Sequence, residues 1–276
     1  MKTASKGADG TRAGRSGGKM KRRPPGMKIF FLGTNGWFAT KTGNTVCAAI
    51  SFHGRLIVLD AGDGFSKLPA LMARLGVRRA DVFLSHVHLD HAGGLHALLL
   101  MPSRMRVRIF VHKSYLPALK RLVAHPYTAS AGEQWAKVSI CPLSAGENLL
   151  PYSVRVLPLD HKDPCFGFRF SLNGREIAYC TDTGPCKNYM RLASGADLLI
   201  TESTLPSGAR PVPAWPHLSP EMAAAEAKKA AVGRLILTHF DAKQPDGAAL
   251  RSRAQSAARK IFLRTTAARD GMEIEA

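Results

Sequence analysis

The sequence predicts an α/β protein in which two sheets are covered by helices. Ten short apolar runs typical of strands alternate with segments of helical periodicity along the 276 residues. Tight-turn dipeptides at His53-Gly54 and Asn173-Gly174 join neighbouring strands and indicate antiparallel sheet. The chain is 45% hydrophobic, which suffices for a sizeable core and is too high for a wholly disordered chain.

The expected strands are short runs rich in β-branched, aromatic and aliphatic residues. They cover residues 29–32, 46–52, 55–60, 81–85, 107–112, 153–158, 166–172, 176–181, 197–201 and 234–238. Helical spacing of apolar residues occurs over 68–75 and 116–123. A third helix should begin at Ser219-Pro220-Glu221, because serine caps a helix, proline suits its first position and an acid favours its N-terminus, and it should run to Ala231. A last helix is expected over 246–262.

The charge balance favours polyanionic partners. Thirty-nine Lys and Arg against twenty Asp and Glu give a formal net charge of +19. An excess of this size attracts nucleic acid, phosphorylated substrates or acidic lipid, and it carries no information about fold.

The sequence divides into a basic tail over residues 1–26 and one domain over 27–276. The tail carries +7, is rich in Gly, Ser, Lys and Arg, and is expected to be disordered. We interpret it as a dispensable extension, with a nucleic-acid-binding arm as the alternative. No run of 18 apolar residues occurs, so a membrane-spanning helix is excluded. Five cysteines without C-x-x-C spacing suit reduced thiols, and a cytoplasmic location is expected.

The segment from Asp81 to Leu95 carries the decisive motif. An apolar strand ends at Ser85, and His86, His88, Asp90 and His91 follow within six residues. Imidazole nitrogens and carboxylate oxygens are ligands that Zn²⁺ and similar divalent metals prefer. Further single ligands follow later strands, namely His161, Asp182 and His239. Since α/β sites gather at strand ends, these residues together supply enough ligands for two metals.

This ordered set closely resembles the metallo-β-lactamase superfamily and, within it, the tRNase Z (ribonuclease Z) and related phosphodiesterase branch. The resemblance extends from Met27 to about Asp241 and includes the segments 32–36, 43–45, 60–62, 167–170, 179–184 and 237–240. It implies a four-layer αββα sandwich with two Zn²⁺, or Mn²⁺ or Fe, at one edge. By resemblance His86, His88 and His161 hold one metal, Asp90, His91 and His239 hold the other, and Asp182 bridges them.

Two more matches imply a phosphodiesterase. The segment around Glu202 resembles one that supplies an acidic residue in tRNase Z-like enzymes, and His217 resembles their proton donor. A phosphodiester leaving group is a poor alkoxide unless it is protonated, and a carboxylate raises the basicity of a neighbouring imidazole. The resemblance implies that a metal-bridged hydroxide, oriented by Asp90, attacks phosphorus while His217 and Glu202 protonate the departing oxygen.

The substrate remains open between RNA 3′ ends and small or cyclic phosphodiesters. The tRNA-processing members carry a long arm between the strands that here cover 166–172 and 176–181, and the Asn173-Gly174 turn leaves no room for it. Trp37 and Phe38 are expected to pack in the first loop, with stacking of bases as the alternative. By analogy with the family, a homodimer is expected.

Two other functions compete. One is hydrolysis of a thioester, lactone or sulfate ester on the same scaffold, which the Glu202 and His217 pair disfavours because such esters need no dedicated acid. The other is a non-catalytic nucleic-acid-binding protein with a structural metal. Structural zinc is normally enclosed by four ligands with cysteine prominent, which disfavours this reading.

Overall fold

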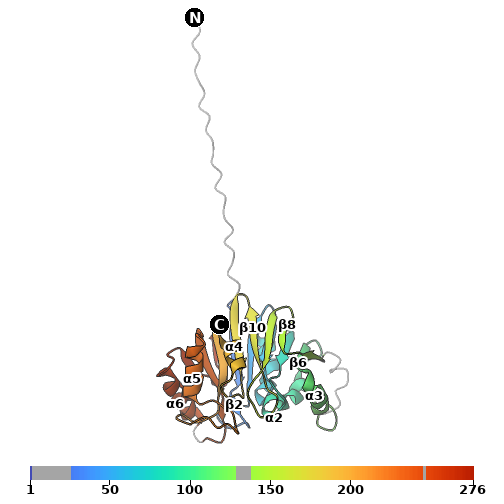
Figure 1. Cartoon of the computed structure of the whole chain (residues 1–276). Helices are drawn as coiled ribbons and strands as arrows, with labels where there is room; N and C mark the ends of the chain where they lie inside the picture. Colours follow the sequence, from blue (N-terminus) through green and yellow to red (C-terminus); the bar gives the residue numbers. More distant parts are fainter. Residues whose placement is uncertain (2–25, 129–137, 245–246) are drawn as a thin grey trace.

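The computed structural model describes residues 26–128, 138–244 and 247–276, together with Met1 (Figure 1). The expected tail therefore lies almost wholly outside the described residues. The bounds and order of the elements below refer to these residues.

The first sheet has the strand order β15-β1-β3-β4-β5-β6-β7. β1, β3 and β4 pair antiparallel, β15 is antiparallel to β1, and β4 through β7 run parallel. The strands are β1 (Lys28–Gly33), β3 (Cys47–Phe52), β4 (Arg55–Leu59), β5 (Arg79–Phe83), β6 (Arg106–His112), β7 (Val138–Leu143) and β15 (Glu273–Glu275).

The second sheet has the order β14-β13-β12-β11-β10-β9-β8, and β2 joins it alongside β13. β8 through β11 are antiparallel, whereas β11 through β14 are parallel. The strands are β2 (Asn35–Gly36), β8 (Gly146–Leu149), β9 (Ser153–Pro158), β10 (Phe166–Leu172), β11 (Arg175–Cys180), β12 (Leu198–Ser203), β13 (Arg234–Asp241) and β14 (Thr265–Ala267).

Helices cover the outer face of each sheet (Figure 1). The first sheet is covered by η1 (Asp63–Lys67), α1 (Leu68–Arg74), α2 (Leu89–Ala92), η2 (Gly93–Leu100), η3 (Lys113–Tyr115) and α3 (Leu116–Leu122). The second is covered by α4 (Lys187–Ala193), α5 (Pro220–Lys229) and α6 (Gly247–Arg259).

Three apolar clusters separate these four layers. The central one lies between the sheets, where the Phe83 ring stacks on Phe110 with centroids 4.7 Å apart and meets Phe170 edge-on at 5.0 Å. The other two clusters lie between each sheet and its own helices. Burial on both faces explains why β4 and the first half of β13 are nearly continuous apolar runs. The αββα sandwich expected from the sequence is confirmed.

Local signals placed most elements correctly. All ten expected strands are present, and both expected turns adopt positive φ at both central residues, as the tight hairpin requires, with Asn173 at 52° and Gly174 at 76°. Ser219 caps α5 by accepting a hydrogen bond from the Met222 N–H at 3.3 Å. The short strands β2, β7, β8, β14 and β15 were not expected, because tertiary pairing rather than local pattern defines them.

The described helices include none that is long and apolar enough to cross a membrane.

Candidate metal centre

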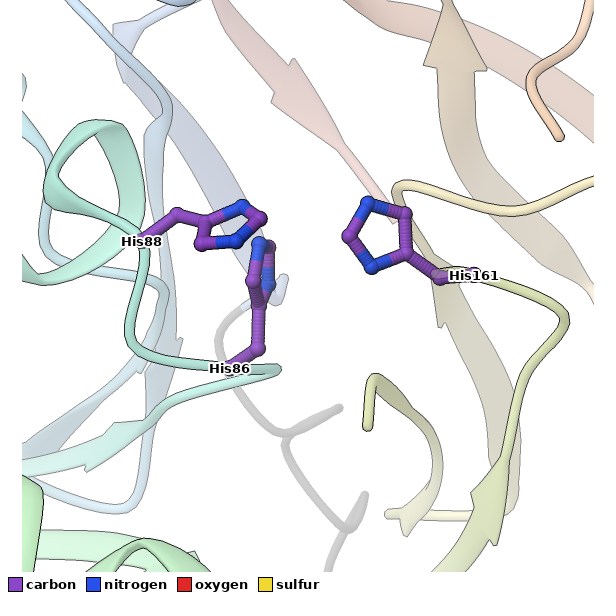
Figure 2. Close-up of side chains that lie close together, drawn as sticks. All are labelled: His86, His88 and His161. Carbon is purple, nitrogen blue, oxygen red and sulfur yellow. The ribbon is translucent and has the colours of Figure 1, made fainter. Parts of the chain in front are cut away.

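The segment after β5 brings four of the predicted ligands to one edge of the sandwich. β5 ends at Phe83, His86 and His88 lie in the loop that follows, and the single turn of α2 carries Asp90 and His91. In Figure 2, His86 and His88 extend from this loop toward His161, which comes from the segment after β9 on the opposite side. The His161 ring centroid lies 5.2 Å from that of His86 and 5.4 Å from that of His88. We call these three residues the outer histidine group.

The remaining predicted ligands come from the second sheet. Asp182 follows β11, as expected. His239 was expected just after its strand, but β13 continues to Asp241 because its end pairs with β2. His239 therefore sits inside the strand at an irregularity, with φ at 53°. Gly36 of β2 permits this close approach, since a Cβ there would lie 2.4 Å from the His239 ring.

Backbone strain is concentrated at this edge. Among the described residues, seven non-glycine positions have positive φ, and Trp37, Asp60, Asp182 and His239 account for four of them. Such conformations cost free energy and persist where the surrounding structure holds them, commonly at functional sites. The strained positions therefore point to the same edge as the ligands.

Asp90, His91 and His239 form a second set, the inner group, which Asp182 joins. The His91 and His239 Nε2 atoms lie 3.1 Å apart. Asp182 Oδ2 lies 2.9 Å from His91 Nε2 and 3.3 Å from His239 Nε2, and Asp90 Oδ2 lies 3.4 Å from His239 Nε2. Two imidazoles and two carboxylates thus converge on one point.

Buried partners fix the rings of the inner group. His91 Nδ1 donates to Asp60 Oδ2 at 2.9 Å, and Asp60 also accepts from the Ser85 N–H, the Ser85 hydroxyl and the Tyr179 hydroxyl. His239 Nδ1 lies 3.0 Å from the Thr204 hydroxyl, which in turn donates to the His239 carbonyl. Both rings consequently present Nε2 to the point of convergence, as metal-binding histidines do when the other nitrogen is held.

The outer histidine group is held in the same manner. His86 Nδ1 lies 3.0 Å from the Ser85 hydroxyl, while its buried Nε2 has no hydrogen-bond partner in the described structure. His88 Nε2 contacts the Asp163 carboxylate at 3.0 Å, and His161 Nδ1 contacts the Asp163 carbonyl at 3.1 Å. A buried nitrogen without a partner is costly, and a cation between these three rings would satisfy it.

The charges around the inner group favour a cation. Burial alone would lower the pKa of His91, but Asp182, Asp90 and Asp60 together raise it well above its ordinary value. Burial would raise the pKa of Asp182, but His239 and His91 hold it well below its ordinary value. The field that favours a proton at His91 Nε2 also favours a metal ion in that place. By contrast, burial lowers the pKa of His86, so that it is neutral and available as a ligand.

The donor atoms therefore fit a divalent metal at two adjacent points. Groups whose donor atoms lie within 4.8 Å of one another include the outer histidine group, the inner group, and sets that join Asp182 to His86 and His91 or to His161 and His217. Imidazole with carboxylate suits Zn²⁺ and neighbouring transition metals. Asp182 is the residue whose carboxylate lies within reach of both points.

Glu202 and His217 form a buried pair beside these ligands. His217 Nδ1 donates to Glu202 Oε1 at 2.8 Å, and the same carboxylate accepts from the Thr183 and Leu218 N–H groups. Burial alone would lower the pKa of His217, but Glu202 raises it above its ordinary value. The structure brings together the two residues that the sequence predicted as an acid pair.

An aromatic pair borders the centre. The backbone N–H of Trp37 donates to the Asp90 carboxylate at 2.7 Å. The Trp37 indole stacks on Trp215 with ring centroids 6.1 Å apart. Trp215 meets the His217 ring edge-on at 4.6 Å. Lys243 Nζ lies 4.3 Å from the centroid of Trp37, whose side chain is 42% exposed. Trp37 and Phe38 were expected to pack in the first loop. Trp37 instead stacks on Trp215 from another loop and faces solvent next to the candidate ligands, and Phe38 is 48% exposed.

Sequence reasoning missed the residues that support the site. Asp60 directly follows β4 at the same edge as the candidate ligands, so its position after a buried strand was a usable signal. Thr204 and Asp163 gave none, because a single hydroxyl or acid in a loop has many ordinary uses. Trp215 and Lys243 are brought to the site only by the loop before α5 and the end of β13.

Comparison with known proteins agrees with this architecture. Residues 55–240 match the family model of the beta-lactamase superfamily domain. Ribonuclease Z of Gemmatimonas aurantiaca is 28% identical, over 90% of this chain and 96% of that protein.

Two solved structures share the fold. The metallo-beta-lactamase fold protein YhfI from Bacillus subtilis aligns with a TM-score of 0.74 at 19% identity, covering 91% of this chain and all of that one. The short form of human tRNase Z aligns with a TM-score of 0.63 at 23% identity, covering 90% and 98%. At these identities the likeness establishes the fold. Since the family model spans well over half of the residues, the chain belongs to the beta-lactamase superfamily and is a hydrolase of that fold.

Proposed function

We propose that this protein is a dinuclear zinc phosphodiesterase. The observation that carries the proposal is the convergence of seven donor side chains on two adjacent points. The outer histidine group would hold one ion and the inner group the other, with Asp182 between them. Zinc is favoured by the nitrogen-rich donor set, with Mn²⁺ or Fe as the other metals that these ligands accept.

Two such ions would supply positive charge for the phosphoryl oxygens and an activated water at neutral pH. The residues of this chain orient the candidate ligands. The Asp90 carboxylate accepts a hydrogen bond from the backbone N–H of Trp37, which fixes it beside His91 and His239. Asp60 and Thr204 hold the two rings of the inner group in one tautomer.

His217 is suited to protonate the leaving oxygen. Its Nδ1 is anchored on Glu202, which leaves Nε2 as the position for the transferable proton. Glu202 raises the pKa of this imidazole against the effect of burial, which increases the fraction of His217 that carries the proton. A dedicated acid supports a phosphodiester over a thioester, because a ribose alkoxide is a much poorer leaving group than a thiolate.

The relatives and the fold favour nucleic acid ends or small phosphodiesters as substrates. Proteins named ribonuclease Z match nearly the whole chain. β10 and β11 are joined directly by the Asn173-Gly174 turn, where the tRNA-gripping arm would be inserted. This turn favours substrates recognised near the scissile bond. Homodimerisation and a cytoplasmic location stay predictions.

The aromatic pair offers such recognition. A cation over an exposed indole contributes about 0.5–1 kcal/mol, whereas a base stacked on an aromatic side chain contributes about 1–3 kcal/mol. A substrate base can therefore replace Lys243 on the Trp37 face and leave the ammonium free for a phosphate. The base would then lie next to Asp90 and His217, which places the adjoining phosphodiester at the metal centre.

The Asp60 carboxylate should control metal affinity without touching the metal. In Asp60→Ala the His91 ring loses its anchor, and zinc affinity should fall about 10- to 100-fold, the usual cost of removing such a partner. Competitive chelator titration measures this change. Asp63→Ala removes an acid three residues away whose side chain makes no hydrogen bond with the described residues. It is the matched control and should bind zinc like the wild type. Equal affinity in both variants, with unchanged circular dichroism, would contradict the assignment.

His217 should matter only where the leaving group needs a proton. Chelator-treated protein should be inactive, and zinc should restore turnover of both bis(p-nitrophenyl) phosphate and an RNA with a 3′ trailer or a short dinucleotide. His217→Ala should lower kcat about 10²- to 10⁴-fold on the ribose leaving group, yet little on p-nitrophenolate, which leaves unprotonated.

The exposed His53→Ala variant serves as the control for this pair of substrates. A zinc-loaded protein that hydrolyses a thioester or lactone but neither phosphodiester would overturn the proposed function. If His217→Ala lowered kcat equally for both leaving groups, the result would contradict only the role of His217 as the acid and not the proposed phosphodiesterase function.

Trp37 should discriminate substrates that carry a base. Trp37→Ala should reduce kcat/KM about 10- to 100-fold for thymidine 5′-(p-nitrophenyl phosphate), as loss of one stacking contact predicts. Methyl p-nitrophenyl phosphate, which has no base, should be affected little. Phe38→Ala, an exposed aromatic in the same loop, is the control and should leave the ratio of the two rates unchanged. A uniform loss on both substrates would refute base recognition.

A further inference from the structure

The edge of the first sheet opposite the metal centre carries an unusual concentration of arginine. A cavity of about 610 Å³ is lined by Arg55, Arg79, Arg104, Arg106 and Arg108 around Asp81. β5 begins at Arg79 and leads to His86 beyond its other end, so the first residues of this strand line the cavity while its far end leads to the metal centre. We call this cavity the arginine pocket.

Four of these arginines, Arg108 and the three named below, lie on the face of the first sheet that points toward the second sheet. Leu56, Ala80 and Val107 belong to the cluster under the outer helices, so the residues that alternate with them face the space between the sheets. Arg55, Arg79 and Arg106 are such residues, at the start of three adjacent parallel strands. Farther along the same strands, Ile57, Phe83 and Phe110 fill the inner core.

Asp81 fixes part of the pocket as a rigid frame. It accepts two hydrogen bonds from Arg108, at 2.7 Å each, and one from Arg55 at 3.0 Å, and the Tyr152 hydroxyl adds another at 2.8 Å. Burial alone would raise the pKa of Asp81, but these hydrogen bonds lower it below its ordinary value. The carboxylate is therefore charged at neutral pH and orients two guanidinium groups toward the cavity.

The remaining positive charge has no partner in the part of the chain that the structure describes. Arg79, Arg104 and Arg106 form no ion pair among these residues, and the buried Nε of Arg55 has no hydrogen-bond acceptor. Arg79 and Arg106 are directly paired across β5 and β6, a like-charge arrangement that destabilises the folded protein. An arrangement that costs stability and serves no internal contact indicates a ligand.

We propose that the arginine pocket binds a compact anion with two or more linked phosphate groups, such as pyrophosphate or the phosphate chain of a nucleoside triphosphate. The five guanidinium groups and the one carboxylate that line the pocket give it a net charge of +4. A single phosphate group carries only about −1.5 to −2. Guanidinium groups bind phosphate oxygens with paired hydrogen bonds, which suits a chain of phosphates in a concave site. An RNA strand spreads its charge over successive nucleotides and matches a hollow of this size less well.

The test compares inorganic triphosphate binding by the zinc-loaded wild type with two double variants in isothermal titration calorimetry at physiological salt. Arg79→Ala/Arg106→Ala leaves the hydrogen bonds to Asp81 intact. It should weaken triphosphate binding at least about tenfold, because the loss of one charge-assisted hydrogen bond already raises the Kd about tenfold or more. Arg253→Ala/Arg264→Ala removes the same charge from exposed sites elsewhere and should bind like the wild type.

Thermal unfolding provides the second readout. Without anion, Arg79→Ala/Arg106→Ala should unfold at the same or a higher temperature than the wild type, because a like-charge pair is removed. With triphosphate, the wild type and the control variant should be stabilised and the pocket variant should not.

Three results would overturn the proposal. The first is equal weakening of triphosphate binding in both double variants, which indicates general charge attraction. The second is orthophosphate binding as tight as that of triphosphate. The third is loss of single-stranded RNA binding in the pocket variant without loss of triphosphate binding. The last would assign the pocket to the nucleic acid backbone instead.

Discussion

The structure depends on an electrostatic constraint at the edge of the sandwich. The Nε2 atoms of His91 and His239 lie 3.1 Å apart between the carboxylates of Asp90 and Asp182. Two imidazoles and two carboxylates, of which only Asp90 is partly exposed, have lost most of their hydration here, and a cation between them compensates for that loss. A proton satisfies this need in part, and a divalent metal satisfies it more fully.

The fold holds this arrangement by locating every ligand where a strand or its backbone direction is fixed. The carboxyl ends of parallel strands from both sheets meet at one edge, so residues distant in sequence become neighbours. Strained backbone at Asp60, Asp182 and His239 turns their side chains inward, and Gly36 and Gly62 allow neighbouring segments to approach. The three apolar clusters supply the packing that keeps these conformations in place.

Most of the fold could be predicted from local pattern. Apolar runs marked the long strands, Asn173-Gly174 marked a hairpin, and Ser219-Pro220 marked the start of α5. The convergence of the candidate metal ligands could be predicted, because their side-chain chemistry is rare after buried strands. The short edge strands were not, since β8, β14 and β15 exist through pairing alone. Asp163 and Thr204 were equally invisible, because their roles depend on which ring the fold brings beside them.

The two edges of the first sheet are opposite in chemistry. At the carboxyl ends of the strands, carboxylates and imidazoles gather and favour cations, whereas at the amino ends arginines gather and favour anions. The same buried strands thus position two charged sites of contrary sign, and β5 belongs to both.

Anomalous X-ray diffraction at the zinc absorption edge, on crystals of the zinc-loaded protein, tests the metal centre most directly. The structure predicts two peaks about 3.5–4 Å apart. One should lie among His86, His88 and His161, and the other among Asp90, His91 and His239, with Asp182 between them. A single peak, or none at these residues after zinc loading, would contradict the dinuclear centre.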